Sequence, residues 1–217
     1  MPNNLQPPDT LDAMTTPSRR DQTVVVIAIV IGASLIAATL RVPRNGTAFY
    51  ACGFTAAAVW TVAAWLCRPI QWMRGGEMSR DLAIGVAVGG AMFGVFVLGA
   101  EIGRNISLLA GPIESVLRKA DGGSMAFVIT LALVSGVAEE LFFRGALLAI
   151  LPVRRAAVLS VVVYVAVTAV TGNTALTVAA IVMGTVFAIE RAVTGGLAAS
   201  ITTHVVWSTL MILALPR

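Results

Sequence analysis

The chain is dominated by long apolar runs that are separated by short polar segments. Seven such runs occupy residues 23–40, 47–67, 82–100, 125–151, 156–171, 174–189 and 195–215. A hydrocarbon core about 30 Å thick needs about 20 apolar residues per helix. The sequence therefore predicts an all-α fold, a polytopic integral membrane bundle with about seven transmembrane helices.

Composition excludes several classes of protein. Hydrophobic residues make up 58% of the 217 residues and charged residues only 12%, whereas an ordinary soluble domain is about 25% charged. A water-soluble globular enzyme and a disordered protein are thus excluded. The net charge of +4 comes from basic residues in short loops, without a dense basic cluster interleaved with aromatic residues. We therefore expect a lipid bilayer, and no nucleic acid, as partner.

Only the first residues depart from the membrane pattern. Residues 1–22 are rich in proline and polar side chains, which predicts a disordered tail, and residues 23–217 then form one membrane domain. An amphipathic piece at 113–120 is expected at the membrane interface. In the third run, Gly85/Gly89 and Gly90/Gly94 predict two close helix contacts.

The distribution of basic residues gives an orientation. Eight arginines fall on the side of the N-terminal tail and six basic residues on the other side. This bias predicts a cytoplasmic N-terminus for a multi-pass protein of the plasma membrane.

The fourth run carries three charges within six residues, Glu139, Glu140 and Arg144. A charged side chain at the centre of a span costs about 2.5 to 3.5 kcal/mol. Glu140 and Arg144 are four residues apart on one helix face and can pair. Glu139 is rotated by about 100° from Glu140, so it can face a different cavity and act as a base toward water. The alternative is a charge cluster that only locks helices together.

A second polar stripe lies in the last run. Gly196, Ser200, His204 and Ser208 recur every four residues, and His204 is the single histidine of the chain. A membrane histidine commonly faces a polar interior, although it can also be a satisfied packing residue. A catalytic zinc usually has three protein ligands, and one histidine with two glutamates disfavours zinc. No cofactor is firmly implied.

Two sequence motifs resemble a known family. The run 135–145, SGVAEELFFRG, is similar to the EExxxR signature of the CPBP family of CAAX-processing and bacteriocin-processing intramembrane endopeptidases, also called the Abi family. The run 190–208, ERAVTGGLAASITTHVVWS, resembles the last motif of that family, in which a histidine is followed four residues later by a polar residue, often asparagine. The resemblance makes 125–215 the CAAX-protease-like core.

The resemblance implies roles for individual residues. Glu139 matches the carboxylate that activates the attacking water, Glu140 and Arg144 match a supporting pair, and His204 matches a histidine that stabilises the oxyanion. The middle motif, FxxxH, is matched by YVAVT at 164–168, so Thr168 stands at the histidine position. Ser208 stands at the asparagine position. The implied substrate is a membrane-embedded or lipidated peptide.

Three functions are compatible with these residues. The first is an intramembrane endopeptidase of the CAAX prenyl protease type that uses a glutamate-activated water. The second is a catalytically degenerate relative that binds a peptide as an immunity or scaffold protein, because Thr168 cannot accept a proton as imidazole does. The third is a small transporter with Glu139 and Glu140 as a proton relay, although the N-terminal half lacks corresponding carboxylates within its spans.

Overall fold

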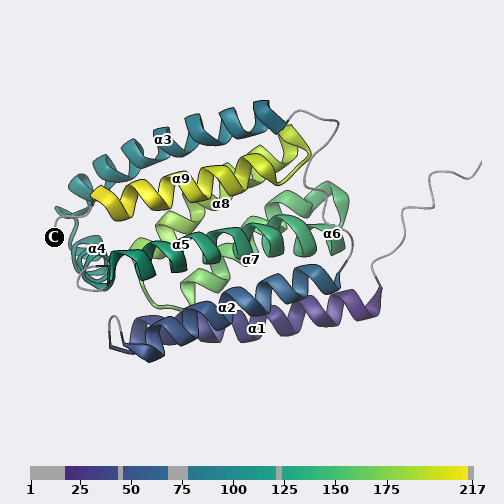
Figure 1. Ribbon diagram of the computed structural model, residues 1–217, viewed down its shortest axis with the longest axis horizontal. Helices are drawn as coiled ribbons and strands as arrows, with labels where there is room; N and C mark the ends of the chain where they lie inside the picture. Colours follow the sequence, from purple (N-terminus) through teal and green to yellow (C-terminus); the bar gives the residue numbers. More distant parts are fainter. Residues whose placement is uncertain (1–17, 44–45, 68–77, 121–123, 215–217) are drawn as a thin grey trace, which may run out of the picture.

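The computed structural model describes residues 18–43, 46–67, 78–120 and 124–214, and every element in these ranges is helical. The elements are α1 (Arg19–Arg41), α2 (Thr47–Leu66), α3 (Met78–Gly103), α4 (Ser107–Ala120), α5 (Met125–Glu140), the π-helix η1 (Leu141–Leu147), α6 (Leu148–Ile150), the 3₁₀ turn η2 (Val153–Arg155), α7 (Ala156–Ala169), α8 (Thr174–Thr194) and α9 (Ala198–Ala214). The long helices run side by side, with α3 and α9 along one edge and α1 and α2 along the other (Figure 1). The predicted all-α membrane bundle is confirmed.

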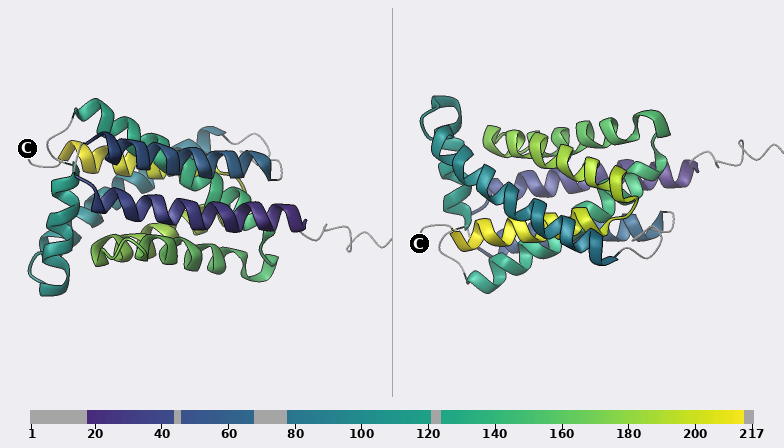
Figure 2. Two further views of the ribbon diagram at one scale, coloured as in Figure 1. Left: turned by 90° about the horizontal axis from the view of Figure 1, so that it is seen from below. Right: turned by 90° about the horizontal axis from the view of Figure 1, so that it is seen from above.

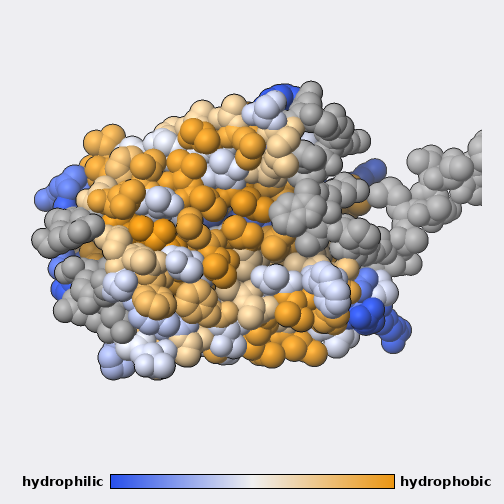
Figure 3. All heavy atoms as spheres, viewed as in Figure 1, coloured by the Kyte–Doolittle hydropathy of each residue, from blue (hydrophilic) through white to orange (hydrophobic). Residues whose placement is uncertain are grey.

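In the part of the chain that the structure describes, five helical segments are long and apolar enough to cross a membrane: α1, α2, α3, α8 and the continuous run Met125–Ile150. The outer surface in Figure 3 is apolar over the middle of the bundle, and hydrophilic residues gather toward its two ends. The remaining predicted spans are shorter, since α7 has 14 residues and α9 has 17. At 1.5 Å per residue they reach about 21 and 26 Å, so the exact number of seven spans stays a prediction.

The first helix begins earlier than the sequence analysis predicted. The Ser18 side chain accepts a hydrogen bond from the backbone N–H of Asp21 at 3.0 Å and caps α1. Residues 19–22 therefore belong to the helix, and the predicted tail was wrong at this boundary because the cap precedes the apolar run. Residues 1–17 lie outside the described residues.

Helix α4 lies across the end of the bundle, at a steep angle to the long helices (Figure 2). It begins at Ser107, six residues before the predicted amphipathic piece. The turn between α7 and α8 holds it in place, because Asn173 Nδ2 donates to the Pro112 carbonyl at 3.1 Å and Thr174 Oγ1 donates to the Leu108 carbonyl at 3.0 Å.

Glycines let α3 approach α9 closely. A Cβ atom at Gly85 would lie 2.7 Å from the Ala199 carbonyl oxygen, and one at Gly89 would lie 3.0 Å from the Thr203 carbonyl oxygen. The predicted contact of this pair is confirmed. The other predicted contact was wrong: no described atom lies within 4 Å of a Cβ built at Gly90 or Gly94, since these glycines lie on a different face of the same helix.

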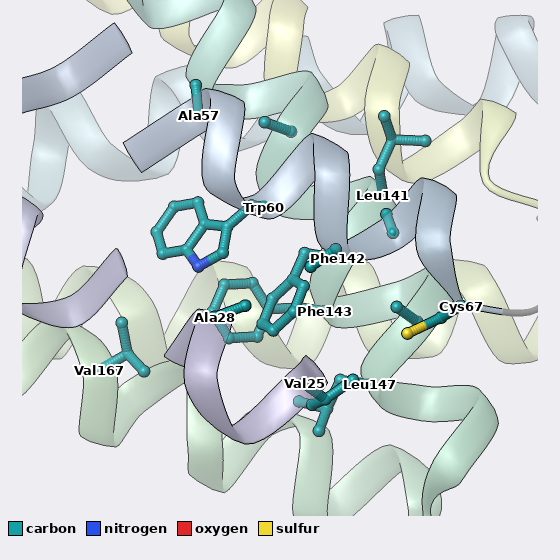
Figure 4. Packing of buried hydrophobic residues seen from close by; sticks show 14 of the residues in the cluster. Val25, Ala28, Ala57, Trp60, Cys67, Leu141, Phe142, Phe143, Leu147 and Val167 are labelled. Atoms are coloured by element: carbon teal, nitrogen blue, oxygen red, sulfur yellow. The ribbon is translucent and has the colours of Figure 1, made fainter. Parts of the chain in front are cut away.

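An aromatic cluster anchors α1 and α2 to the centre of the bundle. Trp60 of α2 stacks on Phe142 with ring centroids 6.1 Å apart and meets the edge of Phe143 at 5.4 Å. Figure 4 shows these rings packed beside Val25 and Ala28 of α1. The segment directly after Glu139 and Glu140 is thus fixed by apolar packing on one side, which leaves the opposite side for polar contacts.

Candidate active site

The backbone leaves α-helical geometry directly after Glu140. A π-helix follows over Leu141–Leu147, a feature that often occurs at functional sites. Two carbonyl groups in this segment receive side-chain donors from other helices: Ser160 Oγ donates to the Phe143 carbonyl at 2.8 Å, and Arg191 Nε donates to the Arg144 carbonyl at 3.2 Å. Backbone groups inside a membrane need such partners, so α7 and α8 stabilise the irregular segment.

Glu140 and Arg144 form the expected pair in the interior. Both side chains are fully buried, and Arg144 Nη1 donates to Glu140 Oε1 at 3.2 Å. Arg144 Nη2 donates to the Gly184 carbonyl of α8 at 3.1 Å. The guanidinium also lies over the rings of Tyr164, at 4.6 Å, and Phe187, at 5.1 Å. The pair thus joins the fourth apolar run to α7 and α8.

Glu139 points to a different partner. The hydroxyl of Tyr164 donates to Glu139 Oε2 at 2.9 Å, and the side chain is only half-buried. The two adjacent carboxylates therefore make separate contacts, one with Arg144 and one with α7. The sequence analysis placed Tyr164 at the phenylalanine position of the middle motif but did not identify its hydroxyl as a partner of Glu139.

His204 reaches the same interior from α9. Its Nδ1 lies 3.5 Å from Glu140 Oε1, and its ring stacks on Phe187 with centroids 4.9 Å apart. A Cβ atom at Gly136 would lie 3.1 Å from His204 Cδ2, so a larger residue at this position of α5 would require the imidazole to shift by a few tenths of an ångström. His204 is also within electrostatic range of Glu139. The structure therefore brings the lone imidazole together with the acidic pair.

Thr168 lies one helical turn after Tyr164, and Ser208 lies one helical turn after His204. Thr168 Oγ1 donates to the Tyr164 carbonyl at 3.0 Å, and Ser208 Oγ donates to the His204 carbonyl at 2.7 Å. Each hydroxyl proton is thus used within its own helix. Thr168 and Ser208 can offer only lone pairs to water or a substrate.

The sequence analysis gave no role to one further buried acid, Glu190. This side chain is 5% exposed and accepts a hydrogen bond from Thr203 Oγ1 at 2.5 Å. The sixth apolar run was predicted to end at 189, which placed Glu190 outside the membrane, whereas α8 continues to Thr194. An acidic residue at the margin of an apolar run was the signal that could have identified it.

Several buried polar atoms in this region have no hydrogen-bond partner among the described residues: Glu140 Oε2, Arg144 Nε, Glu190 Oε2 and His204 Nδ1. Buried polar atoms usually bind a protein group or an ordered water, so these atoms keep capacity for water or substrate. The described part of the chain has no group of three or more His, Cys, Asp or Glu side chains that could hold a metal ion. The donor set therefore does not fit a zinc site with three protein ligands.

A cavity of about 360 Å³ lies between α3, α4, α8 and α9, and His204 is not among the residues that line it. Trp207 and Ser208, in the turn after His204, form part of its wall, and Trp207 packs edge-on against Phe96 with centroids 4.9 Å apart. The rest of the wall is almost entirely apolar and includes Leu109, Ile113, Leu176 and Met211. A hydrophobic group bound in this cavity would lie one helical turn from His204 along α9.

Comparison with known proteins finds one similarity, in the C-terminal part of the chain. Residues 121–210 match the family model of the type II CAAX prenyl endopeptidase Rce1-like proteins. No curated protein and no solved structure matches the chain. The matched range contains every candidate site residue: Glu139, Glu140, Arg144, Thr168, His204 and Ser208. The resemblance that the EExxxR motif indicated is thus confirmed as a similarity: residues 121–210 are similar to Rce1-like type II CAAX prenyl endopeptidases, which is consistent with the CPBP family of intramembrane proteases.

Proposed function

We propose that this multi-pass membrane protein is an intramembrane endopeptidase that hydrolyses a peptide bond through a water molecule activated by Glu139. The observation that carries the proposal is the separation of the two carboxylates. Glu140 is paired with Arg144 at 3.2 Å, whereas Glu139 is held at 2.9 Å by the neutral hydroxyl of Tyr164. A half-buried carboxylate that has no ion pair among the described residues is suited to accept a proton from water.

The reaction needs three functions from these side chains. Glu139 accepts a proton from water, and the resulting hydroxide attacks the carbonyl carbon of the scissile peptide bond. His204 donates a hydrogen bond to the oxyanion that forms, which is commonly a large contribution in acyl transfer. When the C–N bond breaks, the proton held by Glu139 passes to the leaving amine, so the carboxylate is restored.

Glu140 and Arg144 support this site without a chemical step of their own. Their pairing fixes the π-helical segment that begins at Leu141, and Glu140 Oε1, 3.5 Å from His204 Nδ1, keeps the imidazole beside the pair. No cofactor takes part in this proposal. Thr168 contributes at most a hydrogen-bond acceptor for the water.

The substrate that we propose is a membrane-embedded or lipidated peptide. The apolar cavity between α3, α4, α8 and α9 supports this choice, because a hydrophobic segment or lipid group bound there would lie one helical turn of α9 from His204. We also propose the plasma membrane as location and a cytoplasmic N-terminus. Among the described residues, arginines at the end where α1 begins are Arg19, Arg20, Arg80, Arg154, Arg155 and Arg191, against Arg41, Arg104 and Arg118 at the other end.

The test is the variant Glu139→Gln in protein reconstituted into liposomes with prenylated and unprenylated membrane peptides, with products identified by mass spectrometry. The amide keeps the size of the side chain and can still accept from Tyr164, but it cannot take a proton from water. We expect cleavage to be lost. Glu101→Gln, which removes an exposed carboxylate paired with Arg104, is the matched control and should keep full activity. Equal turnover in Glu139→Gln would exclude the mechanism.

A second candidate function is peptide binding without hydrolysis. It is favoured by Thr168 and Ser208, which hold the positions of the family's histidine and asparagine but use their hydroxyl protons within their own helices. A peptide that binds the wild-type protein and is never cleaved would support this function.

A further inference from the structure

Glu190 is a buried acid that the proposed reaction does not use. It lies in the last turns of α8, is 5% exposed, and has no basic side chain within ion-pair distance among the described residues. Its neighbour Arg191 is directed elsewhere, to the carbonyls of Arg144 and Gly195. A buried carboxyl group that lacks a cationic partner is costly in a membrane, so its retention requires an explanation.

The single side-chain partner of Glu190 in the described structure connects three helices. Thr203 of α9 is fully buried, and its Oγ1 lies 2.5 Å from Glu190 Oε1 and 3.2 Å from the Gly85 carbonyl oxygen of α3. The approach of α3 depends on Gly85, where a Cβ atom would collide with Ala199 and Thr202. Glu190, Thr203 and Gly85 thus form one contact between α8, α9 and α3, which we call the Glu190 clamp.

The clamp adjoins the imidazole in sequence and in space. Thr203 immediately precedes His204, and Phe187, on which the imidazole stacks, lies one turn before Glu190 in α8. Within the described ranges no residue hydrogen-bonds the His204 Nδ1 atom, which makes only the 3.5 Å contact with Glu140. The orientation of the ring therefore depends on its backbone position and on the surfaces of Phe187 and Gly136.

We infer that Glu190 is a positioning residue: through Thr203 it fixes the register of α9 against α8 and α3, and so holds the His204 imidazole beside Glu140. The part of this inference that concerns turnover rests on the proposed function. The part that concerns the imidazole does not.

The clamp requires hydrogen bonds and not charge. One hydroxyl proton cannot serve both the Glu190 carboxyl and the Gly85 carbonyl. A glutamine at position 190 can accept from Thr203 Oγ1 through its amide oxygen, as Glu190 does, or donate to it through its amide nitrogen and leave the threonine proton for Gly85. Glu190→Gln should therefore preserve the clamp, whereas Glu190→Ala and Thr203→Val should break it and Thr203→Ser should preserve it.

The single histidine of the chain gives a direct measurement of this inference. Protein labelled with ¹⁵N-histidine, purified in micelles with a histidine-free affinity tag, yields imidazole nitrogen signals from His204 alone. We expect Glu190→Ala and Thr203→Val to shift these signals or split them into several forms, and Glu190→Gln and Thr203→Ser to retain them. Thr185→Val is the control, because Thr185 is exposed on α8 and bonds only its own helix. Thermal unfolding identifies any variant that fails to fold. In that case the imidazole signals of Glu190→Gln and Thr203→Ser, compared with those of the wild type, decide the result.

Turnover gives the second readout. A displacement of a catalytic group by about 1 Å can cost about 10²-fold in rate, so Glu190→Ala should lower kcat by that order with little change in KM, and Glu190→Gln should restore it. Unchanged imidazole signals in folded Glu190→Ala and Thr203→Val would overturn the inference. If the signals respond but no variant, including the wild type, cleaves a peptide, the proposed function fails and the positioning of His204 stands.

Discussion

At the scale of single residues, some contacts of the site follow from the spacing of residues along one helix. Other contacts join distant parts of the sequence and do not follow from that spacing. The Glu140–Arg144 pair and the different direction of Glu139 both follow from helical periodicity, and the structure shows both. The 3.5 Å contact between His204 and Glu140 joins helices that are far apart in sequence. It depends on Gly136, whose missing side chain makes room for the ring, and a lone glycine in an apolar run gives no sign of this role.

The hydroxyl of Tyr164 provides the first prediction. The family's middle motif has phenylalanine at this position, so Tyr164→Phe should keep the fold and the packing of the ring over Arg144. A hydrogen bond to a charged group contributes about 1.5 to 3 kcal/mol, and each 1.4 kcal/mol corresponds to about tenfold in rate. We expect kcat for peptide cleavage to fall at least about tenfold because Glu139 loses the donor that orients it.

Tyr50→Phe, which alters the other tyrosine of the chain, is the control for the Tyr164 variant. Equal kcat in Tyr164→Phe and wild type would show that the 2.9 Å bond does not orient the base.

Thr168 provides the second prediction. It follows Tyr164 by one turn on the same face of α7, so an imidazole introduced there lies on the face that carries the partner of Glu139. General acid–base assistance contributes about 10²- to 10⁴-fold. Thr168→His should therefore raise the cleavage rate of reconstituted protein by about 10²-fold, or create cleavage where the wild type only binds peptide.

Thr168→Val separates the gain of imidazole from the loss of the hydroxyl, and it should leave the rate within about threefold because the hydroxyl proton is already used inside α7. If Thr168→His binds a peptide as the wild type does and still gains no activity, the site lacks more than this one group.

At the scale of elements, the apolar runs located the helices to within a few residues, because hydrophobic length is a local property. The π-helix after Glu140 was not predicted. Its sequence, Leu-Phe-Phe-Arg-Gly-Ala-Leu, contains no proline to disrupt the helix, and the donors that stabilise it, Ser160 and Arg191, come from other helices. The extent of α8 was also missed, since a charged residue was taken as the end of the run although its partner Thr203 makes it acceptable inside the bundle.

The contact between α3 and α9 provides the third prediction. Gly85→Leu would bring a Cβ atom to 2.7 Å from the Ala199 carbonyl oxygen, which forces the helices apart. Overpacking of this kind typically destabilises by about 1 to 3 kcal/mol. We expect a lower midpoint in thermal unfolding of the protein in micelles and a weakened Glu190 clamp.

The same helix contains the matched control for Gly85→Leu. Gly90 has no described atom within 4 Å of a built Cβ, so Gly90→Leu should unfold at the wild-type temperature or above it, because leucine favours helix over glycine. Equal destabilisation by both variants would mean that α3 and α9 do not meet through Gly85.

At the scale of the whole molecule, the arrangement explains why charges are tolerated inside an apolar bundle. The run of α5 and η1 contacts α2, α7, α8 and α9, so Glu140 and Arg144 face protein rather than lipid. Composition predicted that such a bundle exists, and the three charges on one run predicted that the polar site lies on that run. Which helices surround it could not be predicted, because apolar runs of similar composition have no individual preference for partners.

The cavity between α3, α4, α8 and α9 provides the last prediction. Ala179 of α8 lies on its wall, so Ala179→Phe places a ring in the space that the hydrophobic part of a substrate would occupy. Contacts that bind ground state and transition state equally affect KM and not kcat. We therefore expect the variant to raise KM for a lipidated peptide several-fold, with kcat within about twofold of wild type. Ile189→Phe is the matched control, because Ile189 is on the same helix and 57% exposed on the outer surface. A loss of kcat at unchanged KM would instead mean that the cavity shapes the polar site, through Trp207 and Ser208, and does not hold the substrate.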